Sequence, residues 1–435
     1  MTKTLLKNTT AVTFFPGSIE MIDLRIDNGL ILEKGKNLLP HPGEDVIDLR
    51  GKIVLPGMVN AHTHLYSSLS RGMPMPKTPP KNFLEVLKKI WWKLDRALDE
   101  ETIYYSALVG AIEAVQCGTT AMIDHHASPN AIKGSLDIIK EAMAKVGLRG
   151  VLCYEVTDRG GKKQRDEGIS ENENFINANG KNSHFRGLVG AHASFTLNDE
   201  SLSLCAELAE TYKTGVHIHV AEDLCDVADA KKKYGCSIID RLSRKNMITK
   251  KSILAHCIHL SQKDYTKLNK SQAWLANNPR SNMNNKVGVA PIHQFKNRGM
   301  IGTDGFPSDM LEEAKIAFFK RQDSLQKQPI DLAQLISGGQ RCISEIFGSP
   351  FGTLAKNSNA DLIVSDYVAP TPMSQENIFG HYLFGMRSAN IESVMVGGKW
   401  VMKNRTIPGI DLESIYSTAA QKSKKMWIKM METVP

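Results

Sequence analysis

The sequence of 435 residues lacks the features of a membrane or secreted protein. No apolar run approaches the roughly 20 residues needed to cross a bilayer, and residues 1–10 have no apolar core of a signal peptide. Seven cysteines are scattered along the chain without a C-x-x-C pair, which is typical of reduced thiols in the cytosol. We therefore expect a cytoplasmic protein with no membrane partner.

Two other classes of function are also disfavoured. No G-x-G-x-x-G follows an early strand, so a dinucleotide-binding fold has no support. The net charge of +8 is modest, and no basic stripe is interleaved with aromatic residues, so we expect no nucleic-acid partner. The composition, 42% hydrophobic and 23% charged, is that of an ordinary globular protein.

The chain divides into three parts. Residues 1–55 and 356–435 contain short runs with strand character, and the turn signal Asp27-Asn28-Gly29 indicates a hairpin. Residues 56–355 instead alternate apolar strands with amphipathic helices. We expect a small composite β-sandwich domain built from both termini, and a larger domain between them.

The middle part has the pattern of a parallel β/α fold. Eight strands are expected at Met58–Ala61, Thr120–Asp124, Gly150–Tyr154, Gly187–Ala191, Val216–His219, Ser252–Ala255, Ala273–Ala276 and Met300–Gly302. Between most of them lie stretches whose apolar residues have helical spacing, most clearly Glu101–Gln116. Eight strands alternating with helices favour a (β/α)8 barrel, although the count alone also fits an open, doubly wound sheet.

Polar residues stand at the ends of several of these strands. His62 and His64 alternate on one strand and so point the same way, while His219, His256 and Asp304 end three later strands. In a β/α barrel the carboxyl ends of all strands meet at one mouth, where active sites lie. Each residue alone also fits a structural role, such as a buried histidine bonded to a carbonyl. Together they predict a site for a metal ion.

These motifs resemble those of the amidohydrolase superfamily over nearly the whole chain. The segments that carry the likeness are Gly57-Met58-Val59-Asn60-Ala61-His62-Thr63-His64, His219-Val220-Ala221-Glu222, Ala255-His256-Cys257 and Thr303-Asp304-Gly305. The likeness is to the branch of metal-dependent deaminases and triazine hydrolases, and within it to the SsnA-like aminohydrolases, which share the run at residues 278–285.

The resemblance implies a ligand set and a division of catalytic roles. His62, His64, His219 and Asp304 would hold one divalent ion, zinc or iron(II), and a bound metal lowers the pKa of its water toward about 7. Glu222 would move protons, His256 would contact the attacking hydroxide, and Asp304 would orient it. A two-metal subtype uses a lysine on strand four, which this sequence lacks, so we expect a single ion.

Other residues are weaker candidates. His192 follows strand four at a position that resembles a substrate-facing one, and Arg280 could help to shape a planar pocket. The proline-rich segment Arg71–Pro80 is either a lid or a stiff connection. The family likeness also suggests a homodimer.

We expect an aminohydrolase that releases ammonia from an amidine-type carbon of a nitrogen heterocycle or related amine. A triazine chlorohydrolase, a cyclic amidase and an inactive barrel scaffold remain alternatives. The sequence has Asn277-Asn278-Pro279 where many relatives carry His-Asn-Pro, so it does not fix which small molecule is the substrate.

Overall fold

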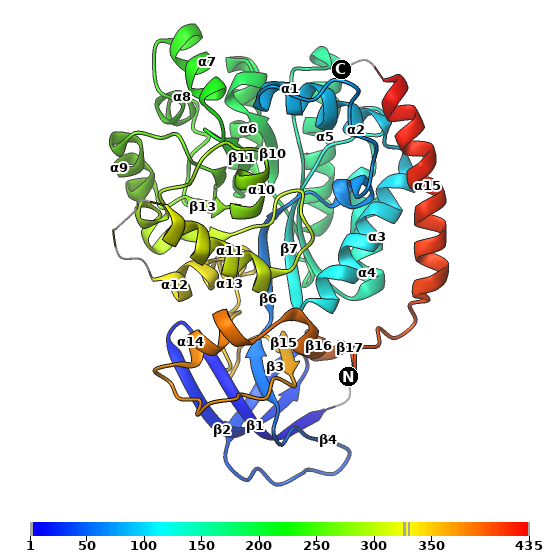
Figure 1. The fold of residues 1–435 in the computed structure, drawn as a ribbon, viewed down its shortest axis with the longest axis vertical. Coiled ribbons are helices and arrows are strands. Elements are labelled where there is room, and N and C mark those ends of the chain that lie inside the picture. The colour runs from blue at the N-terminus through cyan, green and yellow to red at the C-terminus, as the bar shows by residue number, and fades with distance from the viewer. Residues whose placement is uncertain (1–2, 325–327, 329–330, 434–435) are drawn as a thin grey trace.

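The computed structural model describes residues 3–324, 328 and 331–433. A β-sheet occupies one end of the molecule and a helix-wrapped barrel the other (Figure 1). No helix within the described ranges is both long and apolar enough to cross a membrane.

The sheet combines strands from both ends of the chain. Its strands are β1 (Thr4–Phe14), β2 (Gly17–Asp27), β3 (Leu30–Gly35), β4 (Asp45–Asp48), β5 (Ile53–Pro56), β15 (Leu362–Ser365), β16 (Ile391–Val396) and β17 (Lys399–Met402). The order is β17-β16-β15-β5-β1-β2-β3, with β4 beside β1. The antiparallel pair β5–β15 joins the two termini, and β2–β3 is the predicted hairpin. The domain division at residues 55 and 356 stays a prediction.

The barrel consists of parallel strands in two arcs. They are β6 (Met58–Thr63), β7 (Thr119–His126), β8 (Arg149–Tyr154) and β9 (Phe185–Gly187), then β10 (Val189–Ala193), β11 (Val216–Val220), β12 (Ile253–His256), β13 (Trp274–Asn277) and β14 (Gly299–Ile301). The predicted fourth strand is thus split at Leu188. Isolated parallel bridges, Thr63 with Asp304 and Val156 with Ala191, link the arcs at both seams. The strands therefore surround one interior, and the predicted barrel fold is confirmed.

Helices cover the outside of the barrel (Figure 1). The main ones are α3 (Glu100–Gln116), α4 (Ser135–Val146), α5 (Gly161–Asn179), α6 (Asp199–Thr211), α7 (Leu224–Tyr234), α8 (Ile238–Arg244), α9 (Gln262–Ser271), α10 (Pro279–Asn284), α11 (Met310–Asp323), α12 (Leu332–Ile336) and α13 (Gly338–Phe347). Helix α3 begins in a capping box between Asp99 and Thr102. It ends before Gly118, whose φ of +83° suits glycine because it has no Cβ.

The loop after β6 and the last helix lie against each other. After β6 come η1 (Leu65–Ser70), α1 (Phe83–Val86), the π-helical turn η2 (Leu87–Trp91) and α2 (Trp92–Ala97). Helix α15 (Leu412–Glu432) runs along α2 and α3 (Figure 1). The indole of Trp427 donates a hydrogen bond of 2.9 Å to the carbonyl of Leu69. The C-terminal helix is therefore docked on the barrel.

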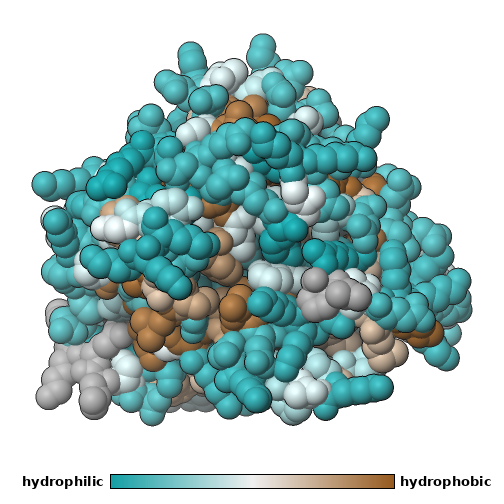
Figure 2. All heavy atoms as spheres, turned by 90° about the horizontal axis from the view of Figure 1, so that it is seen from above, coloured by the Kyte–Doolittle hydropathy of each residue, from teal (hydrophilic) through white to brown (hydrophobic). Residues whose placement is uncertain are grey.

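The remaining helical pieces are short. They are η3 (Ser194–Thr196), η4 (Ile292–Gln294), η5 (Lys296–Arg298), α14 (Ile378–Gly380), η6 (His381–Gly385) and η7 (Ser388–Asn390). Figure 2 views the molecule from the end opposite the composite sheet, where polar residues cover most of the surface and apolar residues show between them.

Candidate metal centre and active-site pocket

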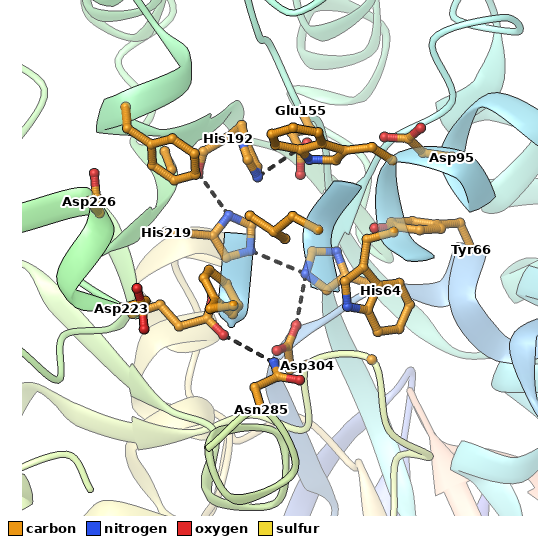
Figure 3. A pocket seen from close by; sticks show the side chains of 18 residues that line it. His64, Tyr66, Asp95, Glu155, His192, His219, Asp223, Asp226, Asn285 and Asp304 are labelled. Carbon is orange, nitrogen blue, oxygen red and sulfur yellow. Dashed lines mark hydrogen bonds and ion pairs between the residues drawn. The ribbon is translucent and has the colours of Figure 1, made fainter. Parts of the chain in front are cut away.

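Three histidines and an aspartate meet at the carboxyl ends of β6, β11 and β14. The Nε2 atom of His64 lies 2.9 Å from Oδ1 of Asp304 and 3.2 Å from Nε2 of His219 (Figure 3). The Nε2 atom of His62 is 3.5 Å from the same carboxylate oxygen. The structure thus brings together the four predicted ligands, which come from segments up to about 240 residues apart.

The hydrogen bonds at Nδ1 of His64 and His219 turn the Nε2 atoms of both rings toward Asp304, where a metal ion could bind. The Nδ1 atom of His64 lies 2.6 Å from the His125 carbonyl, and that of His219 lies 2.8 Å from the His192 carbonyl, so each Nδ1 carries a proton and donates it. The buried Nε2 of His62 has no hydrogen-bond partner within the described part of the chain. Zinc binds histidine nitrogen at about 2.0–2.1 Å, so neighbouring nitrogens 3.2 Å apart fit one ion.

Burial and the carboxylate determine the pKa of three of the four groups. Burial lowers the pKa of His62 to about 3, which keeps the imidazole neutral. Burial would raise the pKa of Asp304, but the imidazoles of His62 and His64 outweigh it and hold that pKa well below its usual range. Burial also lowers the pKa of His64, yet the hydrogen bond to Asp304 prevails and raises it to about 9. A metal ion would displace this proton from His64.

His256 and Glu222 face the same point from the other side. The Nδ1 atom of His256 is 2.8 Å from Oδ1 of Asn282, which leaves Nε2 without a partner among the described residues. That Nε2 lies 3.5 Å from Oε2 of Glu222 and 3.8 Å from Oδ2 of Asp304. Burial, followed by the negative charge of Asp304, raises the pKa of Glu222 well above its usual range. The raised pKa favours the protonated, acidic form of Glu222.

The backbone at this end of the barrel is strained. Ala221, His256, Cys257 and Asp304 all have positive φ, between +48° and +69°, although none is glycine. Such conformations cost of the order of 1–3 kcal/mol each and persist only where the surrounding structure imposes them. They turn the chain sharply at the strand ends and direct His256 and Asp304 toward the centre.

A pocket opens in front of this cluster. It contains about 690 Å³ of empty space, open solvent included, and six carboxyl side chains line it: Asp95, Glu155, Glu222, Asp223, Asp226 and Asp304. Aromatic lining comes from Tyr66, Phe83, Trp91, Trp92 and Phe195. No lysine or arginine of the described chain lines the pocket. The pocket therefore suits a flat, neutral or cationic ligand with hydrogen-bond donors.

The two weaker candidates from the sequence, His192 and Arg280, differ in their position relative to the pocket. His192 lines the pocket, with Nδ1 2.6 Å from Oγ1 of Thr196. Arg280 does not line it, because its guanidinium pairs with Glu313 and Glu312 and donates to the Pro307 carbonyl. The geometry therefore gives Arg280 a structural role and does not support the predicted substrate contact.

Sequence reasoning missed Glu155 in this pocket. Its carboxylate lies 3.4 Å from Nδ1 of His125, 3.4 Å from Nη2 of Arg159 and 3.9 Å from Nε2 of His192. Burial would raise the pKa of Glu155, but His192, His125 and Arg159 together lower it well below its usual range. The signal was present, because Glu155 directly follows the expected strand Gly150–Tyr154.

Comparison with known proteins gives a consistent family and fold. The sequence profile of the amidohydrolase family matches residues 53–401. A 5-methylthioadenosine/S-adenosylhomocysteine deaminase of Caldanaerobacter subterraneus is 27% identical over 97% of this chain and 98% of its own.

Solved structures with the same fold include two that contain zinc. An adenosine deaminase from Xanthomonas campestris with bound zinc has a TM-score of 0.85 at 19% identity, over 97% of this chain and 98% of its own. An atrazine chlorohydrolase from Arthrobacter aurescens complexed with zinc has a TM-score of 0.83 at 21% identity, over 97% of this chain and 100% of its own.

Proposed function

Because the chain belongs to the amidohydrolase family, we propose that it is a mononuclear metal-dependent aminohydrolase. It hydrolyses a carbon–nitrogen bond and releases ammonia from an amidine-type carbon of a nitrogen heterocycle. The deaminase relative and the acid in the pocket both support this activity. The name of that relative makes adenosine-type nucleosides the first compounds to test.

One observation carries the proposal: the carboxyl of Glu222, 3.5 Å from Nε2 of His256, lies in the same pocket as His64, His219 and Asp304 of the predicted metal-ligand set. A divalent ion held by that set lowers the pKa of water toward about 7 and so supplies hydroxide as the nucleophile. An amino group is a poor leaving group until it is protonated, so its departure requires an acid nearby. Glu222 is such an acid, and its pKa is raised as this role requires.

We assign the remaining catalytic roles to His256, Asp304 and Glu222. The Nε2 of His256 and Oδ2 of Asp304, 3.8 Å apart, orient the attacking oxygen. Oε2 of Glu222 gives its proton to the ring nitrogen next to the attacked carbon, which becomes tetrahedral. The resulting carboxylate takes up the proton lost by the nucleophile and passes it to the amino group. The carbon–nitrogen bond then breaks, ammonia leaves, and an oxo product with a closed ring remains.

The alternatives require different features. The atrazine chlorohydrolase neighbour expels chloride, which leaves without a proton, so such a reaction needs only the first of the two proton transfers assigned to Glu222. An inactive scaffold would not need the complete metal set. Residues 185–193 contain no lysine that could bridge a second ion, which supports a single zinc or iron(II). We also propose that the protein is cytoplasmic, because none of the seven cysteines is in a disulfide. The family likeness suggests that it is a homodimer.

The experiment is a substrate screen with metal-loaded protein. Aminopurines, adenosine-type nucleosides, aminopyrimidines, aminotriazines and pterins are incubated, and ammonia and product mass are followed. We expect one equivalent of ammonia per oxo product. Ring-opened products without ammonia would replace the deaminase with a cyclic amidase. Inactivity of metal-loaded protein across the panel would favour the scaffold.

A further inference from the structure

A second cavity lies at the opposite end of the barrel from the metal centre, and we call it the basal cavity. It contains about 1120 Å³ of empty space, open solvent included. Its lining includes Gly215 directly before β11, Lys251 just before β12 and Trp274, the first residue of β13. These are the amino ends of parallel strands, whereas the metal centre lies at the carboxyl ends. A ligand bound in the basal cavity therefore does not occupy the active-site pocket.

Positive charge dominates the basal cavity. Among the described residues that line it, Glu345 is the one carboxylate against five cationic side chains: Arg186, Lys213, Lys250, Lys251 and Arg298. Both oxygens of Glu345 are already bonded, Oε1 to Nη1 of Arg298 at 2.7 Å and Oε2 to the Trp274 indole at 3.3 Å. The other four cations form no ion pair with a carboxylate of the described chain. The rest of the lining is uncharged.

Two connected loops supply the three lysines. The ammonium of Lys251 donates a hydrogen bond to the Lys213 carbonyl, which joins the loop before β12 to the loop before β11. A Cβ atom at Gly215 would collide with the Lys251 carbonyl, so the two backbones touch there. Lys213 and Lys250 are exposed, and their ammonium groups make no hydrogen bond or ion pair within the described residues. An adjoining hollow shares the three lysines, and of the described residues only Glu210 adds a negative charge to it.

Arg186 is partly withdrawn from water and has no carboxylate partner. Its half-buried guanidinium lies 4.9 Å from the centre of the Phe347 ring. Its Nη1 donates to the carbonyls of Phe185 at 3.1 Å and Asn179 at 3.4 Å, while Nε and Nη2 make no hydrogen bond within the described chain. Burial lowers the pKa of Arg186, which means that the charge is costly in this position. An anion would offset that cost, and a guanidinium can bind a phosphate group through two N–H groups at once.

We propose that the basal cavity binds an oligophosphate, an anion with two or more linked phosphate groups. A concave surface lined by charges of one sign focuses the electrostatic field and attracts counter-ions. Four cations without a carboxylate partner match an anion that carries several charges. The inference is independent of the proposed aminohydrolase activity. Inorganic triphosphate and a nucleoside triphosphate both carry this chemistry, so both serve as probes.

The first test is calorimetric titration of the metal-loaded protein with inorganic triphosphate. We expect one triphosphate per chain and an affinity that falls as KCl is raised, because salt screens exposed charges. Adenosine triphosphate is titrated in parallel. Equal affinity would show that the phosphates alone are recognised, and tighter binding would show that the nucleoside also contacts the cavity. If neither probe binds at low salt, or if the affinity does not depend on KCl, the proposal is wrong.

Two variants and a control locate the site. Arg186→Gln should weaken triphosphate binding about 10-fold, since a hydrogen bond to a charged group contributes that much or more. Lys250→Gln changes an exposed side chain, so it should fold normally and weaken binding about two- to fivefold. Lys232→Gln makes the same change at an exposed position of α7 and should bind as tightly as the wild type.

The same variants exclude binding at the metal centre. All of them retain the metal ligands, so a triphosphate that contacted only the active-site ion would bind each as tightly as the wild type, and the proposal would fail. Crystals grown with triphosphate should show its density between Arg186 and Lys250. Density in the active-site pocket alone would contradict the assignment.

Discussion

His62 contacts a second buried histidine, His217, with Nδ1 of His62 2.9 Å from Nε2 of His217. The Nδ1 of His217 lies 3.7 Å from the Cys153 sulfur, and that thiol donates to the Asp124 carbonyl at 3.5 Å. Burial lowers the pKa of His217 well below its usual value, so the ring is neutral. If its proton is on Nδ1, Nε2 accepts from His62, and the His62 Nε2 lone pair then points at the metal centre.

The first prediction concerns this contact. His217→Leu removes the acceptor and should weaken metal affinity by about 10- to 100-fold, as loss of such partners of ligating histidines typically does. His217→Gln can offer a side-chain oxygen to the same proton and should recover part of the affinity. Competition with a chelator measures both values on folded protein. Wild-type affinity in the leucine variant would show that His217 only fills space.

The second prediction concerns the number of ions. Three imidazoles and one carboxylate should retain about one zinc or iron per chain, and a chelator should abolish activity that added metal restores. Elemental analysis after dialysis gives the ratio. Two tightly held ions per chain would contradict the mononuclear assignment and would point to Glu155 and His192, which lie 3.9 Å apart at their closest atoms, as further ligands.

The third prediction concerns Glu222. Glu222→Gln keeps the shape of the side chain but removes the acidic proton, so turnover should fall by about 10²–10⁴-fold with metal content unchanged. Glu207→Gln makes the same chemical change at an exposed position of α6 and should be neutral. Steady-state rates and elemental analysis are compared for both. Near-normal turnover in Glu222→Gln would remove it from the mechanism.

The fourth prediction separates a ligand from its neighbour. His219→Ala should lose metal affinity first, because His219 supplies one of the converging nitrogens. His256→Ala should keep the ion but lose turnover, because His256 lies beside Glu222 and Asp304. Metal content and activity are measured on the same preparations. A metal-free His256→Ala protein would make His256 a ligand.

The fifth prediction concerns the joint between barrel and sheet. Arg149 on β8 makes a buried, bidentate ion pair with Asp361, at 2.7 and 3.0 Å. Asp361→Ala leaves that guanidinium unpaired and should cost about 3–5 kcal/mol of unfolding free energy. The control Asp366→Ala breaks an exposed pair with Arg405 and should cost at most about 1 kcal/mol. Urea unfolding measures both, and equal costs would contradict a structural role for the Arg149–Asp361 pair.

Much of the site could be predicted from the polar residues at the ends of the expected strands. The alternation of His62 and His64, and the apolar runs before His219, His256 and Asp304, predicted which side chains share one mouth, because parallel strands in a barrel end together. Glu155 obeys the same rule but belongs to no recognised motif. The substrate contact of Arg280 stays a prediction; its ion pairs with Glu312 and Glu313 were not foreseeable, because these partners on α11 lie more than thirty positions further along the sequence.

The sequence alone determined the strand and helix pattern and the identity of the polar residues at the strand ends, because periodicity and position are local properties. Only the tertiary structure determined the pKa values and ion pairs of the polar side chains. The lowered pKa of His62, the raised pKa of Glu222 and the pairing of Arg71 with Glu113 depend on burial and on neighbours distant in sequence. The same holds for the pocket in front of the metal centre. A cavity is the space that packed elements leave between them, and no single segment specifies it.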